Sequence, residues 1–322
     1  MSRVSAWFGA RAEHTHLAFL PGPGSRPLLP REGYLRVWLA EGFLAQRRTW
    51  GNEHFPALHG GVTLSFLGTE PVTFSTVTAP SWSTPGVHLD QHISPLVPYL
   101  GGIVGVEAGL YQVSRTGPLG GAVRVLGTLA GLVGPPLAGA AAIAGKISDG
   151  LEAVLAETGN QPILGVHWSM VAPGGIGRPV QPGHLVVIDA PEPPGPLEIV
   201  EGRLRAGGEP VELDHLVLRV ECREERDDPI TPVLADLIRR ASEAALWGNL
   251  DTLEALRKEA IIRAWNSTDL VPRDGKRVAK MIADEIDLAR PMGIVPEREL
   301  RDRLPSRDDP ELKTLSLDAL LG

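Results

Sequence analysis

Hydrophobic and polar residues alternate along several short runs in the first two thirds of the chain. In the run at 34–39 (YLRVWL), Leu35, Val37 and Leu39 share one face of an extended chain. The run at 216–222 (LVLRVEC) alternates in the same way and is the clearest of these patterns. A period of two is typical of half-buried strands, whose outer face is largely solvated in antiparallel sheets. Further runs that predict strands lie at 62–67, 72–77, 99–113, 163–171 and 184–189.

Turn-forming residues separate these runs. Gly207 and Gly208, within RAGGEPVEL at 205–213, predict a hairpin turn. Residues 1–30 contain the proline-rich stretch PGPGSRPLLP and are expected to form an irregular N-terminal arm, because proline lacks the backbone donor that a central strand needs. No segment repeats with a period of 20–50 residues, which excludes solenoids and propellers.

The hydrophobic period changes after RDDP at 226–229. Apolar residues then recur at spacings of three and four, which predicts amphipathic helices over 231–247 and 250–265. A third helix is expected over about 274–289, where Pro291 would stop it, and the tail is expected to hold a short docking helix. Residues 226–322 are therefore predicted to form a helical C-terminal region.

Residues 125–145 (VLGTLAGLVGPPLAGAAAIAG) contain no charged side chain. Gly134-Pro135-Pro136 interrupts this stretch, so each half has about ten residues and spans about half of the hydrocarbon thickness of a bilayer. We therefore expect a buried helical hairpin, inserted at about 118–158. The alternative is a hairpin at 123–155 that leaves the core and enters a membrane, as in pore-forming proteins. The residues of this hairpin expected to contact a membrane or a partner are Leu126, Leu129, Leu132, Val133, Leu137 and Ile143.

These patterns together predict an α+β fold. Its body is an antiparallel β-sandwich over 31–225, interrupted by the apolar helical hairpin, and the helical region at 226–322 follows as an appendage. We expect the strands on both sides of the hairpin to belong to one sandwich, because each set alone is small for an independent core.

Charge and cysteine content narrow the classes of function. The chain of 322 residues has a formal net charge of −8 and no basic run, which argues against a nucleic-acid partner. Cys222 is the only cysteine, so neither an internal disulfide nor a cysteine-based zinc site can form. The first residues have no apolar stretch of the length that a signal peptide needs, and we expect a cytoplasmic protein.

The segment His88-Leu89-Asp90-Gln91-His92 is the best candidate for a metal site. In an extended strand, His88, Asp90 and His92 would share one face and offer two imidazoles and a carboxylate to zinc or iron. The flanking stretches SWSTPG and SP favour a loop, in which this shared face is lost. Surface histidines in a turn are therefore the alternative interpretation.

Three other motifs do not develop into catalytic or cofactor sites. Leu58-His59-Gly60-Gly61 resembles the oxyanion loop of esterases, but the Gly-x-Ser-x-Gly elbow of that fold is absent from the sequence. The glycines at 174–177 do not have the spacing of a dinucleotide fingerprint and predict a turn. His167-Trp168-Ser169 has no evident third residue to orient the histidine. We therefore assign no catalytic residue and expect no cofactor.

The absence of a catalytic motif, together with the strong strand patterns, favours a non-enzymatic interaction or adaptor protein of a soluble cytoplasmic assembly, with a protein as its partner. Two alternatives remain open. The first is a membrane-engaging effector that uses the hairpin at 123–155. The second is a metal-dependent hydrolase built on His88, Asp90 and His92.

Overall fold

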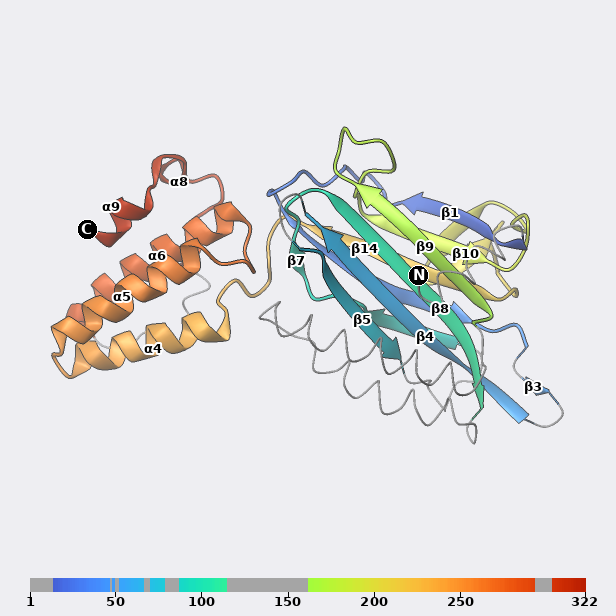
Figure 1. Cartoon of the computed structure of the whole chain (residues 1–322), viewed down its shortest axis with the longest axis horizontal. Coiled ribbons are helices and arrows are strands. Elements are labelled where there is room, and N and C mark those ends of the chain that lie inside the picture. Colours follow the sequence, from blue (N-terminus) through green and yellow to red (C-terminus); the bar gives the residue numbers. More distant parts are fainter. Residues whose placement is uncertain are drawn as a thin grey trace. The chain divides into compact units, whose positions relative to one another are not determined.

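A computed structural model gives the architecture of the chain (Figure 1) and describes residues 14–46, 48–49, 52–66, 70–78, 87–114, 162–292 and 303–322. The chain divides into two compact units. The first, here the β unit, comprises residues 1–30, 35–96 and 100–222. The second, here the helical unit, comprises residues 31–34, 97–99 and 223–322. Antiparallel sheets and helices occur together, so the α+β class is confirmed.

The first sheet of the β unit has the strand order β1-β10-β14-β2-β6. Its strands are β1 (His16–Pro21), β10 (Gly183–Ile188), β14 (His215–Arg223), β2 (Tyr34–Phe43) and β6 (Val87–His92). β10 pairs antiparallel with both β1 and β14, and β6 pairs antiparallel with β2. The predicted strands at 34–39, 184–189 and 216–222 are thus confirmed. The expectation of an irregular arm is wrong for residues 16–21, which form the edge strand β1.

The second sheet has the order β3-β4-β8-β9, and β5 pairs with β4. Its strands are β3 (Arg48–Thr49), β4 (Asn52–Ser65), β5 (Val72–Thr78), β8 (Ile103–Ser114) and β9 (Leu164–Val171). The pairings within this sheet are antiparallel. Leu58-His59-Gly60-Gly61 lies in the middle of β4, so this motif is not a loop.

Two glycines allow the first and second sheets to approach each other. A Cβ atom on Gly42 of β2 would lie 2.6 Å from a side-chain carbon of Leu58 in β4. A Cβ atom on Gly60 of β4 would lie 2.7 Å from the Cδ1 atom of Ile93. Real Cβ atoms do not approach other atoms this closely, so glycine at these positions lets the side chains of Leu58 and Ile93 pack where they are.

A small third sheet covers part of the first. Its strands are β11 (Leu197–Val200), β12 (Arg203–Ala206) and β13 (Glu209–Pro210). Gly207 and Gly208 between β12 and β13 both have positive φ, as the predicted hairpin turn requires. Leu204 of β12 packs in one hydrophobic cluster with Val217 of β14, and Val217 is 1% exposed. The outer face of β14 is therefore not largely solvated there, because the third sheet covers it.

The helical unit contains α4 (Pro232–Leu246), α5 (Leu250–Trp265), α6 (Pro272–Met292), α8 (Glu311–Thr314) and α9 (Leu317–Leu321), together with the short strand β7 (Val97–Pro98). The predicted helices at 231–247 and 250–265 are confirmed, and Thr231 and Asn249 cap them through side-chain acceptors. The prediction that Pro291 stops the third helix is wrong, because α6 extends to Met292. The tail forms two short helices instead of one.

The core of the helical unit is built from the inward faces of α4, α5 and α6. Leu237 of α4, Ile261 of α5 and Ile282 of α6 are among the buried residues of one hydrophobic cluster. Leu320 of α9 belongs to the same cluster, so the end of the chain docks on these helices. The spacing of the apolar residues, at three and four positions, places them on one stripe of each helix.

The predicted helical hairpin at about 118–158 lies outside the described residues, and so do Leu126, Leu129, Leu132, Val133, Leu137 and Ile143. Within the described ranges, no helix combines the length and the apolar character that crossing a membrane requires.

Candidate functional site

Two guanidinium groups contact the indole ring of Trp38 in β2, on one face of the first sheet. The Cζ atom of Arg219 in β14 is 4.5 Å from the centroid of the indole, and that of Arg36 is 5.3 Å away. Both distances are within the range of cation–π attraction. Arg36 and Trp38 are two residues apart in one strand, so the alternation of side chains places them on the same face.

Glu221 of β14 fixes the orientation of the indole. Its Oε2 atom accepts a hydrogen bond from Nε1 of Trp38 at 2.7 Å. The same oxygen is 3.8 Å from Nη1 of Arg36. The carboxylate is 23% exposed and the Arg36 side chain 27%, so this pair is only partly screened by water. The indole is thus held by a hydrogen bond at its edge and contacted by two guanidinium groups over its ring.

Two histidines continue this arrangement onto the neighbouring strands. His92 of β6 pairs with Trp38 in register, and the two rings meet edge to face with 5.7 Å between centroids. His184 of β10 pairs in register with Arg219. Burial lowers the pKa of both imidazoles, and so does the nearby charge of Arg36 at His92 and of Arg219 at His184. Both rings are therefore neutral at neutral pH.

Of the predicted metal ligands, His92 contacts Trp38 and Asp90 lies near Arg219. Asp90 adopts a left-handed backbone conformation, with φ of 47°, and is 62% exposed on its side chain. Its Oδ1 atom lies 3.6 Å from Nη2 of Arg219. The backbone of His88 pairs with that of Gly42, and the side chain of His88 is not among the described ones. Among the described residues, no group of three or more histidine, cysteine and acidic side chains has the arrangement of a metal site. The metal site therefore remains a prediction.

We refer to this arrangement as the Trp38 patch. Its members are Arg36, Trp38, Asp90, His92, His184, Arg219 and Glu221. Two arginines oppose two carboxylates, so the patch has no net charge when its histidines are neutral. The alternation at 34–39 and at 216–222 already placed Trp38, Arg219 and Glu221 on outward faces. Sequence patterns did not bring them together, because they do not specify which strands are neighbours or in which register.

A buried carboxylate lies beneath the third sheet. Glu41 is 1% exposed, and its carboxylate accepts a hydrogen bond from the backbone nitrogen of Leu204 at 2.8 Å. It also lies 2.6 Å from Nε of Arg203 and 3.5 Å from Nε2 of His215. Burial by itself would raise the pKa of Glu41, but these three partners outweigh burial and hold it below the ordinary value. Glu41 is thus ionised and structural.

A break in the alternation of β2 explains why Glu41 is there. Leu39 and Gly42 both approach residues of the second sheet. Ala40 packs in the cluster beneath the third sheet, and Glu41 bonds to that sheet as well. Two consecutive residues therefore face the same side, although the register with β6 is the same before and after Ala40.

The histidine of the esterase-like motif pairs with a serine on the neighbouring strand. Nε2 of His59 and Oγ of Ser75 are 3.1 Å apart. Both residues are buried, and burial lowers the pKa of His59 to about 4. The imidazole is therefore neutral, and neither group is accessible to a substrate in this structure. We interpret the pair as a buried polar contact within the sheet.

Cys222 has no sign of a reactive thiol. Burial, together with the charge of Glu221, raises its pKa to about 12. The thiol therefore stays protonated at neutral pH, as expected of a small hydrophobic residue.

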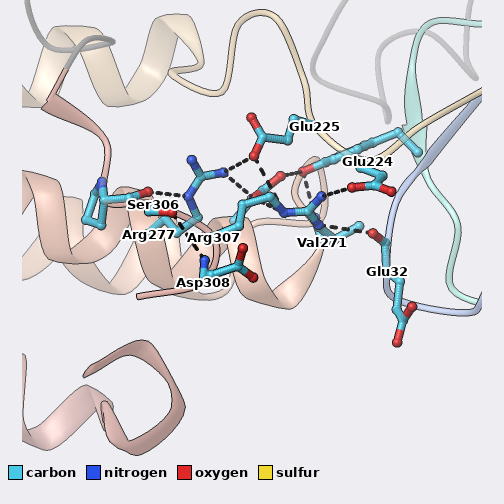
Figure 2. Close-up of polar contacts among 11 residues, drawn as sticks. Glu32, Glu224, Glu225, Val271, Arg277, Ser306, Arg307 and Asp308 are labelled. Atoms are coloured by element: carbon cyan, nitrogen blue, oxygen red, sulfur yellow. Dashed lines mark hydrogen bonds and ion pairs between the residues drawn. The ribbon is translucent and has the colours of Figure 1, made fainter. Parts of the chain in front are cut away.

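The helical unit contains the largest ionic network of the described residues, which centres on two arginines (Figure 2). Arg277 of α6 donates from Nε to the carbonyl of Pro305 at 2.7 Å, and its Nη1 lies 3.3 Å from Glu225. Arg307 donates from Nη2 to the carbonyl of Glu32 at 3.1 Å. Arg277 thus connects helix α6 to the segments at Pro305 and Glu225, and Arg307 connects its own segment to Glu32.

Asp274 and Tyr34 form the buried part of this network. Asp274 is 2% exposed and accepts a hydrogen bond from Arg277 at 3.0 Å. Its other oxygen accepts one from the hydroxyl of Tyr34 at 2.7 Å. The hydroxyl in turn accepts a hydrogen bond from the backbone nitrogen of Val271 at 3.1 Å. Because every charge here has a partner, we interpret the network as a structural clamp of the helical unit.

Comparison of the chain with protein-family models, with curated proteins and with solved structures finds no match in any of the three.

Proposed function

We propose that the chain is a non-enzymatic adaptor protein of a cytoplasmic assembly and that it binds a protein partner through the Trp38 patch. The observation that carries this proposal is the contact of partly exposed Trp38 with the guanidinium groups of both Arg36 and Arg219. Tryptophan and arginine are the residue types that most often dominate the binding energy of protein interfaces.

The fixed geometry of the patch supports this role. The indole is held by Glu221 and flanked by two guanidinium groups before any partner arrives. A side chain that is already ordered loses little conformational entropy on binding, which favours affinity. The balanced charge of the patch also favours a mixed protein surface over a polyanion such as nucleic acid.

The proposal includes a β-sandwich as the scaffold. The close approach of the first and second sheets at Gly42 and Gly60 supports face-to-face packing of these two sheets. In this arrangement the Trp38 patch is carried on the outer face of the first sheet, because Leu39 on the opposite face is directed toward the second.

The proteins encoded by the genes that flank this one are the probes for the test. Each of these proteins and the full chain are purified separately, and the affinity between them is measured by isothermal titration calorimetry. We expect one of them to bind and Trp38→Ala to weaken the affinity by at least about tenfold, as loss of a central anchor does. Arg219→Glu should weaken it too, because it reverses one of the two stacked charges.

The control is Arg26→Glu, which makes the same charge change at another exposed arginine of the β unit. Thermal melting of each variant establishes that it is folded. A partner that binds wild type, Trp38→Ala and Arg219→Glu equally would show that the patch is not its docking site. A chain that binds none of these proteins would contradict the adaptor role in this genetic context.

A further inference from the structure

The turn between α4 and α5 presents three large apolar side chains to solvent. Leu246 is 56% exposed, Trp247 is 85% exposed and Leu250 is 66% exposed. They are near neighbours in sequence at the end of one helix and the start of the next. We refer to these three residues as the α4–α5 tip. A tryptophan buries about 150–250 Å² when it is covered, so the tip exposes much of the area that an interface anchor uses.

The backbone of the tip is held in one conformation. The amide of Trp247 donates to the carbonyl of Glu243 at 3.1 Å, and that of Asn249 donates to Ala244 at 2.9 Å. Gly248 adopts φ of 65°, the left-handed conformation that ends many helices. The Asn249 side chain then caps α5 by accepting from the amide of Thr252. A rigid turn of this kind presents an anchor that is largely preorganised.

The folding of the helical unit does not explain why residue 247 is a tryptophan. Its side chain is outside the hydrophobic cluster that fills this unit, and a helix end of this geometry depends on the glycine that follows. An exposed Trp with two exposed leucines is instead the composition of a site that another molecule covers.

The charges around the tip indicate the chemistry of that molecule. Glu243 lies one turn before Trp247, Asp251 follows Leu250, and Glu254 lies one turn further along α5. The two glutamates form ion pairs with Arg239 and Lys258. Both basic residues are further from the tip in sequence than the glutamates are. Acidic residues next to an apolar tip oppose insertion into an anionic membrane and favour a partner with basic residues.

We propose that the α4–α5 tip inserts into an apolar pocket of a protein partner whose rim carries lysine or arginine. This surface rests on the proposed adaptor function and gives it a second attachment point. It lies in the helical unit, whereas the Trp38 patch lies in the β unit, so each can fail without the other.

A helical peptide of leucine and lysine serves as the probe, because it offers an apolar face with a basic rim. Fluorescence anisotropy of the labelled peptide measures its affinity for the full chain. We expect Trp247→Ser and Leu250→Ser each to weaken binding by at least about tenfold. Val233→Ser, at an exposed apolar residue near the other end of α4, should bind as wild type does. Trp38→Ala should also bind as wild type.

Further probes identify the outcomes that would overturn the proposal. The same peptide with glutamate in place of lysine should not bind, and equal binding would exclude a basic rim. Tryptophan-dependent binding to phosphatidylcholine or phosphatidylserine vesicles in a sedimentation assay would assign the tip to a membrane. A dimer of wild type that becomes a monomer in Trp247→Ser would assign it to a second copy. Unchanged peptide affinity in Trp247→Ser would exclude the tip as an anchor.

Discussion

The hydroxyl of Tyr34 donates a hydrogen bond of 2.7 Å to the carboxylate of Asp274, although 240 residues separate them in the chain. Both residues are buried, and burial together with the charge of Asp274 raises the pKa of the Tyr34 hydroxyl. The contact connects the short segment 31–34 to the start of helix α6 within the helical unit. It therefore closes a large loop of the chain by one hydrogen bond to a charged group.

We expect Tyr34→Phe to lower the free energy of unfolding by about 2–3 kcal/mol. The substitution leaves the carboxylate of Asp274 and the backbone nitrogen of Val271 buried with one partner fewer, and bonds to charged groups are the strong ones. Urea denaturation of the full chain, followed by far-ultraviolet dichroism, measures the change.

Tyr111→Phe is the matched control for this prediction. Tyr111 is also buried, but among the described residues its hydroxyl has no hydrogen-bond partner. Removing a buried, unsatisfied hydroxyl should leave the stability unchanged or raise it by about 1 kcal/mol. Equal destabilisation by the two substitutions would contradict the assignment of the Tyr34 hydrogen bond.

Glu41→Ala should destabilise the chain by about 1–3 kcal/mol. The variant leaves the buried backbone nitrogen of Leu204 without the acceptor that it contacts at 2.8 Å, whereas Arg203 is partly exposed and can be hydrated. Glu41→Gln should cost less, because it keeps the shape and one acceptor and because Arg203 is 42% exposed. Chemical denaturation provides the measurement, with Glu198→Ala, at an exposed position of β11, as a control expected within about 0.5 kcal/mol of wild type.

The hypothesis of a metal site at His88, Asp90 and His92 makes a separate prediction. Elemental analysis of the purified chain should find bound zinc or iron that is lost in His92→Ala. Arg219→Ala should then raise the affinity, because its guanidinium lies 3.6 Å from the Asp90 carboxylate and opposes a cation there. Metal content that is the same in wild type and His92→Ala would contradict the hypothesis.

The strands that sequence patterns predicted well are those in which one face is apolar and the other polar. The runs at 34–39 and 216–222 satisfy this condition along most of their length. Strand β1 was missed because its residues precede a proline-rich stretch that suggested an irregular arm. The middle of β4 was missed because Gly60 and Gly61 suggested a loop, although Gly60 is there to let Ile93 approach.

The candidate site was predicted only in part. His92 and Asp90 were singled out for the residue types that bind metals, and the structure places them beside Trp38 and Arg219. The identity of those neighbours depends on strand order and register, which are long-range properties that local periodicity does not contain. The exposure of Trp247 at the α4–α5 tip was not predicted either. Trp247 ends the helical pattern at 231–247, whose apolar residues were expected to face the core.

The last prediction concerns His59, whose pKa burial lowers from 6.5 to about 4. The unfolded chain takes up a proton at this imidazole as the pH falls below about 6.5, whereas the folded protein does not until about pH 4. Because the unfolded state binds more protons in this window, folding stability declines as the pH is lowered through it. The decline from this group alone amounts to about 3 kcal/mol.

His59→Gln removes this titration and keeps a polar side chain beside Ser75. Denaturant midpoints are measured for wild type and His59→Gln across the window from neutral to mildly acidic pH. We expect the free energy of unfolding of wild type to fall more steeply, with a difference between the two of about 3 kcal/mol over the window. The difference between the two pH profiles is the relevant quantity, because other groups titrate in both proteins. The substitution can also change the free energy of unfolding by the same amount at every pH. Parallel pH profiles would mean that the His59 imidazole is hydrated or paired with an acid in the folded protein.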